Sequence, residues 1–153
     1  MPQKKFSLDS KPVRIFLIIL CIVLSFMLYM QRRTKNHYKE AARLPFYNVQ
    51  PSEVADGTWH GKTYTSFLHV QLDVTVQDGK LSRIDIVENE GLGGKNITPL
   101  LDEMITQNNS VVTALKGDEL ASIVFIACVD DALFKGLPLE KQEELKKTDD
   151  KEK

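Results

Sequence analysis

The sequence predicts an α+β fold in which a small antiparallel sheet packs with two helices and is preceded by one N-terminal transmembrane helix. Three observations support this prediction: an unbroken apolar run, ten residues of strict apolar–polar alternation, and two later segments with helical apolar spacing. They divide the chain into five parts, namely a basic flank (1–12), a transmembrane anchor (13–30), a stalk or linker (31–55), a folded domain (56–134) and a charged, disordered tail (135–153).

The apolar run at residues 13–30 has the length of a membrane span. A helix of this length covers about 27 Å, close to the hydrocarbon thickness of about 30 Å, and its one charge, Arg14, lies at the edge. A cleaved signal peptide is the alternative, but Gln31-Arg32-Arg33 follows the run in place of a small-residue cleavage site. We therefore expect an uncleaved, single-pass anchor in the cell membrane, whose helix can extend through residues 35–44 until Pro45.

Charge is distributed unevenly along the chain. Residues 1–43 carry nine Lys or Arg and two acidic residues, whereas residues 44–153 carry 11 basic and 19 acidic ones, a net charge of −8. An acidic soluble part argues against nucleic acid as a partner, because binding of phosphates needs a basic face. The basic segment suits anionic lipid headgroups, so the membrane is the expected partner. The charges at the two ends of the anchor, +3 over residues 1–14 and +4 over residues 31–43, leave the orientation open.

Three consecutive strands are predicted in the domain. Residues 58–65 are rich in aromatic and β-branched side chains, and residues 68–77 alternate between apolar and polar side chains. Asp78-Gly79 is the dipeptide typical of a type I′ hairpin turn, and residues 80–88 then supply the partner strand. Strands joined by such short turns form an antiparallel sheet.

The second half of the domain predicts two helices. After the glycine-rich loop 90–94, apolar residues recur with helical spacing, and Asn96 or Thr98 can cap this helix; the apolar positions are Ile97, Leu100, Leu101, Met104 and Ile105. A short strand is predicted at 111–115. A second helix is predicted at 118–134, and it should be central because residues 123–129 are apolar on all sides.

This order of elements, with four short motifs, resembles the FMN-binding domain over about residues 56–134. The motifs are Asp56-Gly57-Thr58-Trp59-His60-Gly61, residues 74–80, Gly91-Leu92-Gly93, and residues 128–133. The family includes the C subunit of sodium-pumping NADH:quinone reductase and the G subunit of the related ferredoxin-linked complex. The resemblance implies FMN as cofactor, electron transport with redox partner proteins or membrane-complex subunits, and a domain on the extracytoplasmic side.

The resemblance also implies how the flavin is held. In the family, a threonine in a Ser-Gly-Ala-Thr motif usually links FMN covalently, and the matching positions here are Lys116, Gly117, Asp118 and Glu119. Glu119 has no hydroxyl group, so we expect FMN to be non-covalent. The two carboxylates oppose a phosphate, with repulsion of about 1 kcal/mol at 4 Å in water, whereas Lys116 attracts one.

The cofactor-binding residues that the resemblance implies are Gly91, Leu92, Gly93, Lys116 and Gly117. An ordinary strand-to-helix turn is the alternative explanation of the three loop residues. The sequence suggests no catalytic residues and no metal ligands, so redox chemistry would come from the cofactor. Three functions remain open: a non-covalent flavin electron carrier or redox accessory; a degenerate, flavin-free structural or accessory subunit of a membrane complex; and a domain that binds another small ligand in the vacated pocket.

Overall fold

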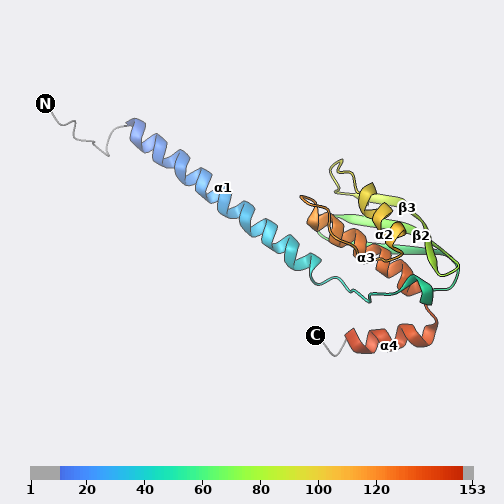
Figure 1. Cartoon of the computed structure of the whole chain (residues 1–153). Coiled ribbons are helices and arrows are strands. Elements are labelled where there is room, and N and C mark those ends of the chain that lie inside the picture. Colours follow the sequence, from blue (N-terminus) through green and yellow to red (C-terminus); the bar gives the residue numbers. More distant parts are fainter. Residues whose placement is uncertain (1–10, 150–153) are drawn as a thin grey trace. The chain divides into compact units, whose positions relative to one another are not determined.

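The computed structural model describes residues 11–149 and confirms the predicted α+β class (Figure 1). The described residues form four α-helices, one short 3-10 helix (η1) and one three-stranded antiparallel sheet. The elements in chain order are α1 (Lys11–Ala41), η1 (Pro51–Glu53), β1 (Gly57–Tyr64), β2 (His69–Gln77), β3 (Lys80–Glu90), α2 (Thr98–Gln107), α3 (Glu119–Lys135) and α4 (Leu139–Asp149). The chain divides into two compact units, and the boundary lies between Asn36 and His37.

The first unit holds most of α1. The large apolar side chains of this helix, from Ile15 to Met30, are exposed in the isolated chain. The helix is long and apolar enough to cross a membrane. It continues past residue 30 to Ala41 without a break, as the sequence up to Pro45 allows.

The sheet is the centre of the second unit. Its strands lie in the order β1-β2-β3, and all neighbours are antiparallel. Along β2, the side chains of Val70, Leu72 and Val74 are fully buried. Asp78 and Gly79 have φ values of 53° and 69°, the left-handed conformation that a type I′ turn requires. The three predicted strands and their hairpin are therefore confirmed.

Two helices cover one face of the sheet, as predicted. α3 packs on β1 and β2, while α2 packs on β3. β1 and α3 approach closely at Gly61, where an added Cβ would overlap the carbonyl oxygen of Cys128. Glycine at this position lets the backbone of the strand touch the helix. α3 is the central helix, with twelve of its side chains buried.

The short strand predicted at 111–115 is absent, and this prediction was wrong. Polar contacts at both ends of the segment hold it along α3 instead of in the sheet. Ser110 Oγ donates to Asp130 Oδ1 over 3.4 Å, and Leu115 N donates to Ser122 Oγ over 2.9 Å. Only Val112 of this short apolar run is buried, and Val111 and Thr113 are exposed, so the run does not need a strand to cover it.

The predicted boundaries of the domain also need correction. The second unit begins at His37, and Val49 and Val54 lie in its core, so much of the predicted linker 31–55 is part of the fold. The predicted disorder of 135–153 is wrong for the residues of α4, which form a helix. Lys141 Nζ of this helix forms an ion pair with Glu53 Oε1 at 3.1 Å. Residues 150–153, like most of the predicted flank at 1–12, lie outside the described residues.

Candidate functional site

A small hollow lies between the glycine-rich loop after β3 and the first turn of α3. Its volume is about 140 Å³. Two of the predicted site residues, Gly91 and Leu92, line it together with side chains that no sequence motif identified. The full lining is Phe67, Leu68, Gly91, Leu92, Lys95, Leu120 and Ala121. The hollow therefore combines an apolar wall with one cation, Lys95.

The wall of the hollow depends on glycine at position 91. Gly91 has φ of 96°, and an added Cβ would overlap the carbonyl oxygen of Phe67. The glycine-rich loop can therefore lie directly against the turn between β1 and β2. A second hollow, of about 200 Å³, shares Phe67, Leu68 and Gly91 with the first and is otherwise lined by Ser66, His69 and Glu90.

The other three predicted site residues do not line this hollow. Gly93 is exposed, with φ of 65° and no atom within 4 Å of an added Cβ. Lys116 and Gly117 are exposed in the turn before α3. That turn leads directly into Leu120 and Ala121, so the two predicted segments converge on the same end of α3.

Side chains of the chain itself occupy the start of α3. Gly117 N donates to Glu119 Oε1 over 2.9 Å, and this hydrogen bond lowers the pKa of the Glu119 carboxyl below its ordinary value. Asp118 forms an ion pair with Lys95. A helix N-terminus attracts anions through its free backbone N–H groups. Here the Glu119 carboxylate accepts the backbone N–H of Gly117, whereas the Asp118 carboxylate makes no capping hydrogen bond and is paired with Lys95.

The turn that forms the wall is also joined to the end of α1. Glu40 accepts hydrogen bonds from Ser66 N, at 2.7 Å, and from Ser66 Oγ. The imidazole of His37 stacks on the ring of Phe67, with 4.7 Å between the ring centroids. Within the second unit, the last turn of α1 is thus fixed to the residues that line both hollows.

A buried carboxylate, Asp130, fixes the segment that follows α1. Its two oxygens accept Tyr47 N at 2.6 Å and Val49 N at 3.0 Å, and its side chain is fully buried. Desolvation raises the pKa of Asp130 above its ordinary value, while the hydrogen bonds from the backbone oppose this shift. These contacts are those of a structural anchor, because each carboxylate oxygen is satisfied by a backbone N–H group of the segment after α1.

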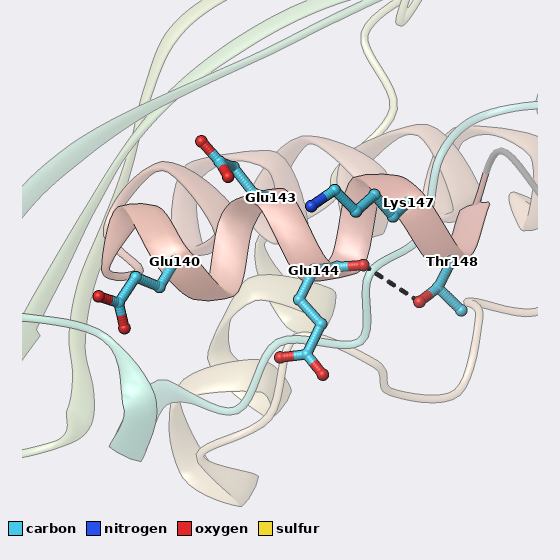
Figure 2. Close-up of a pocket in the computed structure, with 5 residues that line it drawn as sticks. All are labelled: Glu140, Glu143, Glu144, Lys147 and Thr148. Atoms are coloured by element: carbon cyan, nitrogen blue, oxygen red, sulfur yellow. Dashed lines mark hydrogen bonds between the residues drawn. The ribbon is translucent and has the colours of Figure 1, made fainter.

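A larger hollow on α4 lacks the features of a binding site. It measures about 430 Å³, and its five lining residues all belong to α4. Figure 2 shows their side chains pointing to different sides of the helix, with Thr148 donating to the Glu144 carbonyl at 3.1 Å. Binding sites are built from groups that converge from several elements. Within residues 11–149, no group of three His, Cys, Asp or Glu side chains is placed to hold a metal ion.

Comparisons with protein-family models, characterised proteins and solved structures find no significant match to this chain. The candidate site therefore rests on the chain's own residues. Phe67, Lys95 and Leu120 were missed in the sequence because they lie in three different segments with no common motif. Trp59 packs against the core, and its Nε1 donates to the Ala55 carbonyl at 2.9 Å.

Proposed function

We propose that this chain is a single-pass membrane protein whose second unit is a domain of the FMN-binding type and carries FMN non-covalently, as an electron carrier or redox accessory. One observation supports this proposal above the others. Gly91 and Leu92, which the resemblance matched to the flavin loop, share one hollow with the first turn of α3. In the proposal, that hollow is the flavin site.

The hollow suits part of a flavin only. Its lining is mostly apolar, which favours the edge of an aromatic ring. Its volume of about 140 Å³ lies below the range of roughly 300–1,000 Å³ that is usual for pockets holding ligands of this size. The ring edge would therefore enter beside Leu92 and Ala121. The ribityl phosphate would stay outside, where the carboxylates of Asp118 and Glu119 are acceptors and cannot donate a hydrogen bond to it.

The chain's own role would be to position the ring and tune its surroundings. Bound FMN supplies the redox chemistry, which no side chain in the site provides. The backbone contact between Gly91 and Phe67 would set the position of the ring edge. Lys95 would lie near the ring as a positive charge, partly offset by Asp118. Such a site would pass electrons to redox partner proteins or membrane-complex subunits.

The membrane part of the proposal rests on α1. We propose that residues 13–30 span the bilayer and that the domain lies on the extracytoplasmic side, as the resemblance implies. A cysteine in place of exposed Ser52, introduced with Cys21→Ser, tests the orientation. A membrane-impermeant maleimide should label it in intact cells. Labelling only after the cells are lysed would place the domain in the cytoplasm.

Titration of FMN tests the flavin site directly. The full chain in detergent should quench FMN fluorescence on binding, and Ala121→Leu, which fills the hollow, should weaken binding by at least about tenfold because it removes the space for the ring. Ala42→Leu is the control, because Ala42 is exposed and outside the hollow. Equal binding by both variants would place the flavin elsewhere, and no binding by the native chain would refute the carrier role.

The second candidate function is a flavin-free structural or accessory subunit of a membrane complex. The engaged carboxylates at the start of α3 favour it, because they replace the anchor for the flavin phosphate. This function predicts that the protein purified from its native membranes carries no flavin and brings partner subunits with it. A solitary protein with bound flavin would contradict it.

A further inference from the structure

The two edges of the sheet differ in how they are covered. At the β1 edge, Asp131 Oδ2 accepts Lys62 N at 2.9 Å, and Lys135 Nζ donates to the His60 carbonyl at 3.0 Å. Side chains of α3 therefore close that edge. Unpaired edge strands can pair with another chain, and proteins commonly protect them in this way.

The β3 edge is open along most of its length. Its start is covered, because Leu81 N donates to Asn108 Oδ1 over 2.7 Å. From Arg83 to Glu90, the described residues show no backbone hydrogen bond to β3 other than those from β2. Ile86 and Val87, in the middle of this stretch, are 38% and 55% exposed. The open edge thus presents free backbone groups beside exposed apolar side chains.

The side chains of β3 follow a regular pattern once its two bulges are set aside. The register with β2 skips Ser82 and Val87, so these two residues are the bulged positions. The remaining residues alternate between the two faces. The open face of the sheet carries Lys80, Arg83, Asp85, Glu88 and Glu90, and the helix-covered face carries Leu81, Ile84, Ile86 and Asn89.

Charge along the open face changes sign from one end of β3 to the other. Lys80 and Arg83 are basic and come first, whereas Glu88 and Glu90 are acidic and come last. An antiparallel copy of β3, related by a two-fold axis at Asp85, places opposite charges across from each other on the open face. It pairs Arg83 with Glu88 on the open face and Ile84 with Ile86 on the other face, while the start of β3 stays covered by Asn108. A parallel copy would place like charges together.

We propose that two copies of this chain associate through their β3 edges, antiparallel about Asp85, and form one continuous six-stranded sheet. The interface is isologous, as closed two-fold symmetry requires. Asp85 meets its own copy at the axis, and its bond from Arg83 Nε at 2.8 Å offsets that repulsion. One strand pair is a small interface, but confinement of both copies to one membrane raises their effective concentration.

Disulfide cross-linking of the full chain in lipid vesicles tests this pairing. Asp85→Cys lies on the proposed axis, where antiparallel neighbours have Cα atoms about 4.5–5.5 Å apart, within reach of a disulfide. Thr58→Cys, exposed on the closed β1 edge, is the matched control, and both variants carry Cys21→Ser. Mild oxidation should give covalent dimers of the Asp85→Cys chain only. Equal dimer yields from the two variants would overturn the proposal.

Charge reversal on the open face of β3 gives a second test, in which a rescued cross-linking yield shows that a lower yield is not caused by misfolding. In the Asp85→Cys background, Arg83→Glu or Glu88→Arg alone turns two symmetry-related attractions into repulsions and should lower the cross-linking yield about tenfold. The double variant restores opposite charges and should recover the yield. A double variant that cross-links as poorly as the single ones would contradict antiparallel β3 pairing.

Discussion

Asp130 offers the sharpest test of how the fold is held together. Its carboxylate accepts the backbone N–H groups of Tyr47 and Val49 at 2.6 and 3.0 Å inside the core. Replacement by alanine removes the acceptor of both hydrogen bonds, at a cost of about 1–3 kcal/mol for each bond. Relief from burying a charge offsets part of this loss. We therefore expect Asp130→Ala to lower the free energy of unfolding by about 2–4 kcal/mol at pH 7.

Urea unfolding, followed by the fluorescence of Trp59, measures this effect in the second unit, because Trp59 is the single tryptophan. With an m value of about 2 kcal/mol/M, the midpoint should fall by about 1–2 M. Asp130→Asn keeps one acceptor and should cost less than alanine. Asp102→Ala, at an exposed position on α2, should change the stability by less than about 0.5 kcal/mol. If Asp130→Ala behaves like Asp102→Ala, Asp130 does not anchor the segment after α1.

Three further predictions concern Glu119, Gly61 and the protonation of Asp130. Glu119→Gln removes a negative charge beside the proposed phosphate position. In a fluorescence titration, the affinity for FMN should therefore rise about fivefold, while the affinity for riboflavin, which has no phosphate, stays unchanged. An equal rise for both ligands would contradict a phosphate effect. Gly61→Ala should destabilise the second unit by about 3 kcal/mol in thermal unfolding, because the new Cβ meets the Cys128 carbonyl. Gly93→Ala should cost only about 1 kcal/mol, because it strains a left-handed backbone without a clash. Similar losses of stability for the two variants would refute the close approach at Gly61. Burial raises the folded-state pKa of Asp130, so the stability that this group contributes is present below its unfolded pKa of about 4 and is lost as the pH rises through the folded value. The stability difference between the native chain and Asp130→Asn, measured by urea unfolding from pH 3.5 to 7, should shrink as the pH rises, and a growing difference would reverse the assigned shift.

Local patterns in the sequence were sufficient to predict the sheet and its two helices. Alternation along β2 and the Asp78-Gly79 turn depend on neighbouring residues, so they can be recognised without knowledge of the fold. The segment 111–115 was misassigned because its place is decided by hydrogen bonds to Asp130 and Ser122 of the next helix, α3, and not by pairing with a strand. Contacts of that kind leave no periodic signal.

The boundaries of the domain and the site were predicted less completely for the same reason. The segment 37–55 reads as a polar linker, yet Asp130 and Ser66 bind it to the domain. In the site, Gly91 was named only through the resemblance, as a residue beside the flavin, and the close approach that the structure shows is to the Phe67 carbonyl. Phe67 and Lys95 join the site only through tertiary packing.

The absorbance spectrum of the purified full chain is the most direct test of the central claim, that the hollow beside Gly91 and α3 holds a flavin without a covalent bond. After incubation with FMN and removal of the excess, a flavin band near 450 nm should remain with the folded protein. Denaturation and filtration should then release all of that absorbance into the filtrate. A native chain with no flavin band would contradict the claim, as would a band that stays with the denatured polypeptide.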